Sequence, residues 1–540
     1  MNFYDSYNKA RLSYELASKL SRCWISKYYC KSDFGLSHLP IERIQSFSQF
    51  YFFSCMVESE IIRKKYQIEY KIPNTWHHYP TLEKYSNKSW YKNFLQTFKL
   101  VLFRTVDFIA MLFGSRFVNK FQDKKYEVVF VGSRRHLNEI SESIIKLSKR
   151  FKVLVIGKID AETKLKFDKG EVDFLDVPSG IKFFRRLDRI KIVFKFLLTR
   201  WGPQSSIGNK KICNIFKSGE WKSRLLYLKL MLFPEIVALY KLAFKILSTA
   251  RPAIVITTTS NDTFGASFSL AALAQKIKVA EFQHGFFKVW DFEWEFCNSD
   301  FFLTWGEGSR RISRKTVPQQ HIVGLPFSKI RFKSHLSQKR IGKNKRILFL
   351  WCPVLGSASL YKSELANDTF SKLIKAFSGF PQSWKITIRT HPAYVLFEDL
   401  RGLKIPKNIK IHDRASIESA LDKHDVIITQ ATTAGLFAII KRKPLLFFDN
   451  SWLNKKLGNP YVRSGSALNI PENSLDNLYS YVINFINDKD KIRKQRKAQK
   501  RFVKQALYKT GRGSTIEIER FVETIIDKRF VKLKGITSAF

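Results

Sequence analysis

Hydrophobic and polar positions follow a repeating pattern along much of this chain of 540 residues. The segment YEVVFVGSRRHLNEISESIIKLSKRFKVLVIGK, at 126–158, reads as an apolar strand, a short turn with a glycine, a helix and a second strand. The helix is indicated by apolar positions at Ile140, Ile144 and Leu147. Two strands joined by a helix form a βαβ unit, which predicts a parallel sheet.

Further apolar runs extend this pattern into two successive blocks. Strands are predicted in the first block at 172–177, 253–259, 279–284, 300–305 and 321–326, and in the second block at 346–352, 385–392, 409–413, 425–430 and 444–449. We therefore expect an α/β protein with two Rossmann-like domains that face a cleft. Ligands would bind at the carboxyl ends of the strands.

The domain boundaries follow from where these runs start and stop. We expect a helical N-terminal extension, a first Rossmann-like domain with a helical insertion at about 180–250, a basic linker, a second Rossmann-like domain and a set of basic C-terminal helices. These five parts span, in that order, residues 1–122, 123–327, 328–345, 346–470 and 471–540.

The charge of the chain points to anionic partners. Lys and Arg number 94 against 46 Asp and Glu, a formal net charge of +48 that would attract nucleic acid, anionic lipid headgroups or phosphorylated substrates. Two basic amphipathic stretches, 98–117 and 223–248, are typical of helices on a membrane surface, or of core helices whose lysines reach solvent. There is no secretory signal and no apolar run of about 18 residues, so a transmembrane helix is not predicted.

Several function classes lack their sequence signatures. The six cysteines are scattered without a CxxC pair, which argues against a disulfide scaffold or a zinc ribbon. The chain has no GxxxxGK[ST] motif of P-loop ATPases, no HExxH metal motif and no complete GxGxxG pattern.

The strongest candidate for chemistry in the first block is His284. It ends a predicted strand in the segment EFQHGFF and is followed by Gly285, which would let a ligand approach the backbone. An imidazole in this place suits a general base, although a hydrogen-bonded structural histidine beside a turn fits the same pattern. Weaker candidates for the cleft or the acceptor are Arg134, Arg135 or His136 after the first strand, and Glu307 in TWGEGS, which also fits a surface turn.

The second block carries candidates for phosphate binding. Arg389 and His391 come at the end of the strand ITIRTHP and offer two donors to a phosphate. The strand VIITQ is followed by Thr432, Thr433 and, after one alanine, Gly435 at the start of an apolar helix. Hydroxyls and small residues at a helix N-terminus favour an anion site, and a threonine cap without a ligand is the alternative.

Taken in order, these segments resemble bacterial surface-polysaccharide transferases. The strand ending in QHG, the TWGE segment, the R-x-HP strand and the TTAG helix start are similar to motifs of GT-B-fold enzymes. These enzymes include capsule-polysaccharide biosynthesis proteins, HP-motif sialyltransferases and CDP-glycerol glycerophosphotransferases. The resemblance covers roughly residues 250–525.

The resemblance implies a glycosyltransferase that uses a nucleotide-activated sugar, without a further cofactor or an obligatory metal. His284 would be the general base of an inverting displacement, while His391, Thr432 and Thr433 would contact the donor phosphate. The acceptor would be a lipid-linked or growing glycan. We then expect a cytoplasmic protein that lies peripherally on the anionic inner face of the plasma membrane.

Four other functions stay open at this point. A polyol-phosphate transferase of the CDP-glycerol type shares the motif order, and a nucleotide-sugar 2-epimerase shares the HP strand but usually has Gly-Gly where this chain has Ala434-Gly435. A nucleic-acid-binding protein would explain the charge, yet helix-turn-helix, zinc-finger and RNP signatures are missing, so no specific nucleic acid is expected. A non-catalytic scaffold of capsule assembly is the fourth.

Overall fold

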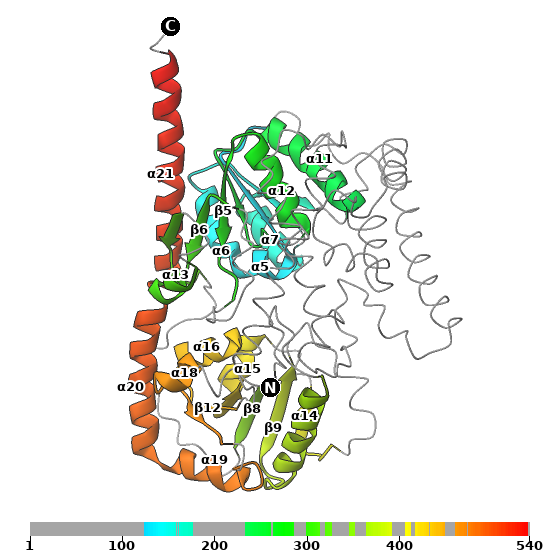
Figure 1. The fold of residues 1–540 in the computed structure, drawn as a ribbon, viewed down its shortest axis with the longest axis vertical. Helices are drawn as coiled ribbons and strands as arrows, with labels where there is room; N and C mark the ends of the chain where they lie inside the picture. Colours follow the sequence, from blue (N-terminus) through cyan, green and yellow to red (C-terminus); the bar gives the residue numbers. More distant parts are fainter. Residues whose placement is uncertain are drawn as a thin grey trace, which may run out of the picture.

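Two parallel sheets organise the chain in the computed structural model (Figure 1). The structure describes residues 124–176, 233–285, 299–313, 319–326, 345–351, 363–390, 405–411, 416–448, 459–471 and 474–537, apart from positions 158, 160, 261, 262 and 431. The predicted extension at 1–122, nearly all of the linker and the insertion up to residue 232 lie outside these described residues.

The first sheet has seven strands in the order β3-β2-β1-β4-β5-β6-β7, all parallel. The strand order reverses between β1 and β4, which places a topological switch point at the middle of the sheet. The elements are β1 Val128–Gly132, α5 Arg134–Glu139, α6 Ser141–Ser148, β2 Val153–Gly157, α7 Ala161–Lys169, β3 Asp173–Asp176, α11 Phe233–Ala250, β4 Ile254–Thr257, α12 Thr263–Ala274, β5 Lys278–Phe282, β6 Phe301–Thr304, α13 Glu307–Ser313 and β7 Gln319–Ile322.

The second sheet repeats this order in six parallel strands, β10-β9-β8-β11-β12-β13. The prediction of two Rossmann-like domains is thereby confirmed. The elements are β8 Arg346–Trp351, α14 Ser363–Ser378, β9 Lys385–Thr390, β10 Ile409–Ile411, α15 Ile417–Lys423, β11 Val426–Thr429, α16 Thr433–Ile440, β12 Leu445–Phe447, α18 Pro460–Arg463, β13 Leu468–Asn469, α19 Leu478–Asn487, α20 Lys489–Ala506 and α21 Arg512–Thr537.

Both faces of the first sheet are covered, which explains why its strands read as unbroken apolar runs. Neighbouring residues of a strand point to opposite faces. In β1, Val128 and Phe130 belong to the core that α6 and α21 complete, whereas Val129 and Val131 belong to the core that α11 and α12 complete. Helices α6 and α21 thus cover one face of the sheet, and helices α11 and α12 cover the other.

Helix α11 contributes its apolar side to this core. Over 239–250, Leu239, Ala243 and Leu247 are buried, while Lys241 and Lys245 are exposed. Of the two interpretations of the stretch 223–248, its described part fits the core helix with exposed lysines; the stretch 98–117 lies outside the described residues. Within the part of the chain that the structure describes, no helix is long and apolar enough to cross a membrane.

The last two helices join the domains: α20 runs along the second domain and α21 along the first (Figure 1). The α20 side chain of Gln495 pairs with both backbone groups of Leu445 in β12, at 3.0 and 2.7 Å. From α21, Glu519 forms an ion pair with Lys146 of α6 at 3.0 Å, and Thr515 shares a buried hydrogen bond of 2.8 Å with Ser143.

Residues 507–511, which we call the crossover, connect α20 to α21 and are bound to the first domain through backbone atoms. The Tyr508 N–H donates to the Trp305 carbonyl at 2.9 Å. Leu325 then donates to the Lys509 carbonyl at 2.8 Å and accepts from the Gly511 N–H at 2.9 Å. The crossover therefore pairs with the first domain much as an added strand would.

This close approach requires glycine on the first domain. A Cβ at Gly306 would stand 2.2 Å from the Ala506 carbonyl oxygen. A Cβ at Gly324, which has φ +84°, would stand 2.3 Å from the Lys509 carbonyl oxygen. Both contacts involve backbone atoms, which cannot rotate away.

The Gly306→Ala substitution should therefore lower the free energy of unfolding by about 1–3 kcal/mol, because the end of α20 and the start of the crossover must move to make room. Gly308→Ala is the matched control, since a Cβ there meets nothing within 4 Å. Thermal or urea unfolding of both variants checks this. Equal stability of the two variants would contradict the proposed packing.

Candidate active site

The segment after β5 is held by a buried amide side chain. Gln283 is 1% exposed, and its Nε2 donates to the Gly285 carbonyl at 2.9 Å and to the Ser309 hydroxyl at 3.0 Å. Its Oε1 accepts from the Trp305 N–H at 2.8 Å. These bonds fix the turn that carries His284, and Gly285 completes the turn with φ +87°. In the sequence, Gln283 is visible only as part of the QHG motif, and the pattern predicts no role for it.

His284 lies beside a second histidine. The ring centroids of His284 and His136 are 4.9 Å apart, with an angle of 36° between the ring planes. His136 comes from α5, directly after β1, and its Nδ1 is 3.2 Å from the Ser133 hydroxyl and 3.5 Å from the Thr259 hydroxyl. Two imidazoles thus meet at the carboxyl ends of β1, β4 and β5, beside the switch point of the first sheet.

A buried carboxylate orders the loop that follows β4. Glu281 is 2% exposed, and its two oxygens accept from the Ser260 backbone N–H at 3.1 Å and from the Ser260 hydroxyl. Burial of a carboxylate is costly unless hydrogen bonds satisfy it, as they do here. Because Ser260 follows Thr259, this pair also fixes the hydroxyl next to His136. No sequence pattern predicts the hydrogen bonds between Glu281 and Ser260.

In the second domain, Thr432 is the N-cap of α16. Its side chain accepts from the Gly435 N–H at 3.1 Å. The Thr432 carbonyl accepts from the Tyr461 hydroxyl at 2.9 Å. Burial raises the pKa of the Tyr461 phenol above its usual value, so this group remains a neutral donor. The N-terminus of α16 is therefore fixed by two side-chain hydrogen bonds.

Gly435 has a packing role in this structure. A Cβ at this position would come within 2.9 Å of the Thr429 hydroxyl and 3.0 Å of a Tyr461 ring carbon. Its N–H is already bonded to the Thr432 side chain. The absence of a side chain at Gly435 lets α16 lie close to β11. Thr433 is the first residue of α16.

The two domains approach each other at these two segments. A Cβ placed on Gly285 of the first domain would stand 3.6 Å from the Thr433 hydroxyl of the second. The residue next to His284 thus nearly touches the N-terminus of α16. The structure thus brings the turn that carries His284 to Thr433, although the two lie in different blocks of the sequence.

The other residues that the sequence predicted for the site are Arg389, His391, Arg134, Arg135 and Glu307. Arg389 is half-buried in β9, next to its last residue, at the same edge of the second sheet as Thr432. His391 lies outside the described residues. Arg134 and Arg135 are the first two residues of α5, and only their backbone is described. Glu307 begins α13, and its side chain is 39% exposed and forms an ion pair with Arg310 at 2.9 Å.

The arrangement favours an anion between the domains. A helix N-terminus, two imidazoles and a guanidinium at a strand end offer hydrogen-bond donors and positive charge. Among the described residues, no group of three or more His, Cys, Asp and Glu side chains could hold a metal ion. The fold and this site define a protein of two Rossmann-like domains with a polar site where the carboxyl ends of β5 and β11 meet.

Comparison with known proteins gives structural likenesses. No protein-family model matches the sequence, and neither does any curated protein. The calicheamicin glycosyltransferase CalG4 is similar at a TM-score of 0.43 and 11% identity, over 75% of this chain and 98% of its own. HepE from Anabaena in complex with UDP-glucose is similar at 0.43 and 10%, over 75% and 100%. The UDP-GlcNAc 2-epimerase from Methanocaldococcus jannaschii is similar at 0.39 and 14%, over 69% and 98%.

We predict that Gln283→Leu lowers the free energy of unfolding by about 2 kcal/mol, because it leaves the buried Trp305 N–H and the partly buried Gly285 carbonyl without their partner. Gln505→Leu, at an exposed position of α20, should stay within about 0.5 kcal/mol of the parent. Urea unfolding measures both. A Gln283→Leu protein as stable as the control would show that this network does not hold the turn.

Proposed function

We propose that this protein is a nucleotide-sugar-dependent glycosyltransferase of surface-polysaccharide biosynthesis. The observation that carries the proposal is the approach of the His284-Gly285 turn to Thr433 at the start of α16. It puts a candidate base and a candidate phosphate site within one small volume, each supplied by a different domain.

The second domain would hold the donor. The N-terminus of α16, with Thr433 at its first position, suits the diphosphate of a nucleotide-activated sugar, because helix amides and the helix dipole both favour negative charge there. Arg389 and His391 would add charge-assisted hydrogen bonds from the end of β9. The same donors would stabilise the diphosphate as it leaves.

The first domain would activate the acceptor. His284 would take the proton of an acceptor hydroxyl while that oxygen forms a bond to the anomeric carbon. The bond from this carbon to the diphosphate oxygen breaks on the opposite face, and its electron pair leaves with the nucleotide. His136 borders the same place, with its ring centroid 4.9 Å from that of His284.

The acceptor would be a lipid-linked or growing glycan. This part of the proposal is supported by the order of the QHG, TWGE, R-x-HP and TTAG motifs, which resembles surface-polysaccharide transferases. The net charge of +48 also suits an acidic glycan or a lipid phosphate as the acceptor's carrier.

A panel of nucleotides tests the donor site. Thermal unfolding with UDP, CDP, CMP or GDP should show one nucleotide that stabilises the protein, by about 2.7 kcal/mol at about 100 times its Kd. Arg389→Gln should reduce this stabilisation, and Lys385→Gln, at the exposed start of the same strand, should leave it unchanged. If none of the four nucleotides stabilises the protein, the proposal is overturned.

Substitution of the base separates catalysis from binding. His284→Ala should lower turnover of the matching nucleotide-sugar by about 10²–10⁴-fold and leave the Kd of the nucleotide unchanged. His321→Ala, an exposed histidine of β7, is the control and should keep its activity. Equal loss of turnover and nucleotide affinity in His284→Ala would contradict the base assignment. Conversion of the sugar to its epimer without any acceptor would identify an epimerase instead.

A further inference from the structure

Helix α20 exposes a row of cations on one side. Lys494, Lys497, Lys500, Arg501 and Lys504 are all exposed. At about 100° per residue these five positions fall within an arc of about 120°, and they extend over about 15 Å of the helix axis. The row is therefore a compact strip of positive charge, which we call the basic strip.

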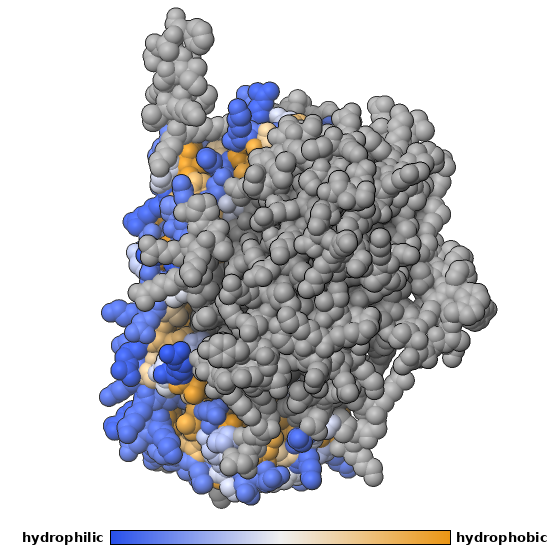
Figure 2. Space-filling model, in the orientation of Figure 1, coloured by the Kyte–Doolittle hydropathy of each residue, from blue (hydrophilic) through white to orange (hydrophobic). Residues whose placement is uncertain are grey.

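The opposite side of α20 fixes the orientation of this strip. Gln495, Gln499, Phe502 and Ala506 are buried. Both glutamines bond to backbone groups of the second domain, Gln499 to the Lys443 and Ser466 carbonyls at 2.9 and 3.0 Å. A helix anchored in this way cannot turn its charges inward. Figure 2 shows hydrophilic residues along the edge of the molecule where α20 lies.

The positive charge of the strip is not balanced by nearby acids. The acids at the start of α20 are already paired, Asp488 with Lys491 at 3.4 Å and Asp490 with Arg493 at 3.1 Å. Within the part of the chain that the structure describes, the five cations of the strip form no ion pair. The clustered positive charges repel one another unless an external anion compensates them.

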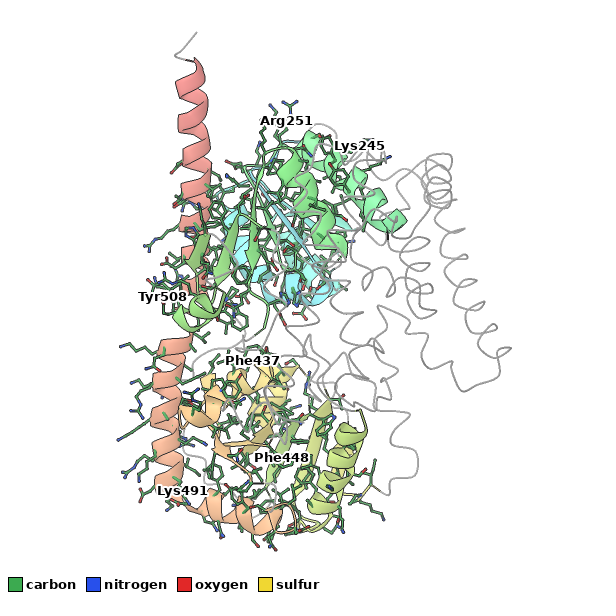
Figure 3. All side chains as sticks on the ribbon, viewed as in Figure 1. Lys245, Arg251, Phe437, Phe448, Lys491 and Tyr508 are labelled. Carbon is green, nitrogen blue, oxygen red and sulfur yellow. The ribbon has the colours of Figure 1, made fainter. Side chains whose placement is uncertain are left out.

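An exposed aromatic side chain continues the strip. Tyr508 is the second residue after the end of α20 and is 55% exposed, and the Lys509 Nζ lies 4.9 Å from the centroid of its ring. In Figure 3, Tyr508 lies at the edge of the molecule along which α20 runs, whereas Lys245 lies on another side. Tyrosine is typical of side chains that sit at a lipid headgroup layer, because the ring is apolar and the hydroxyl polar.

We propose that the basic strip and Tyr508 dock this protein on an anionic lipid surface. A straight row of charges on the outer edge of a helix can touch a plane along its whole length, and the anionic cytoplasmic leaflet offers such a plane. Nucleic acid is the competing polyanion. Single-stranded nucleic acid is generally held by several aromatic rings that stack on bases, and the strip has one exposed aromatic neighbour, Tyr508.

This inference does not rest on the proposed glycosyl transfer, since it concerns a surface that none of the candidate site residues occupies. The two would complement each other. An enzyme held at the lipid surface by α20 would meet a lipid-linked acceptor at high local concentration.

Vesicle sedimentation tests the proposal with the full chain. The probes are phosphatidylcholine vesicles with and without phosphatidylglycerol. The test variant replaces the five cations of the basic strip by glutamine. The matched control also removes five positive charges, from exposed lysines of the first domain: Lys149, Lys152, Lys241, Lys245 and Lys278.

The parent protein should bind only the vesicles that contain phosphatidylglycerol, and added salt should weaken this binding. Each cation near such a surface contributes about fivefold in affinity, so the test variant should bind more than about a hundredfold more weakly. The control should bind much more strongly than the test variant. Thermal unfolding of both variants should remain cooperative, as in the parent, which verifies folding separately from docking.

Two outcomes would overturn the proposal. Equal loss of vesicle binding in the test variant and the control would show that net charge alone, and not the basic strip, attracts the lipid. Tighter binding of a short duplex DNA than of vesicles at the same salt, lost in the test variant, would assign the strip to nucleic acid.

Discussion

Backbone pairing between the crossover and the first domain is the constraint on which the arrangement of the two domains depends. Leu325 donates to Lys509 and accepts from Gly511, and these bonds are possible because Gly306 and Gly324 leave room for the chain. Helices α20 and α21 extend this link in both directions, and both contribute buried side chains to one apolar cluster that includes residues of both sheets. The position of the second sheet relative to the first is thus set by a segment near the end of the chain.

The candidate site is a consequence of that arrangement. Within each domain, its residues are held by buried polar groups: Gln283 and Glu281 in the first, Tyr461 in the second. These groups leave the His284 ring and the start of α16 in defined places. Only the relation between the domains brings them near each other, so a shift of the crossover would separate base and phosphate site without altering either.

Much of the fold was predictable because its strands are buried on both faces and so appear as continuous apolar runs. The two-residue strand β13, Leu468–Asn469, was missed because so short a run has no periodicity to read. The boundary of β7 was also misplaced. The run at 321–326 suggested the strand, whereas the strand is Gln319–Ile322, and Leu325 instead pairs with Thr510 of the crossover.

For the candidate site, the sequence by itself determined which side chains end which strands, because strand ends and helix starts depend on local patterns such as QHG and TTAG. It did not determine what those side chains meet. That Gly435 packs against Tyr461, that His136 lies beside His284, and that Gly285 faces Thr433 were decided only by the tertiary structure. The physical reason is that each contact joins segments distant along the chain, and their separation depends on helix packing and on the crossover, which local patterns do not encode.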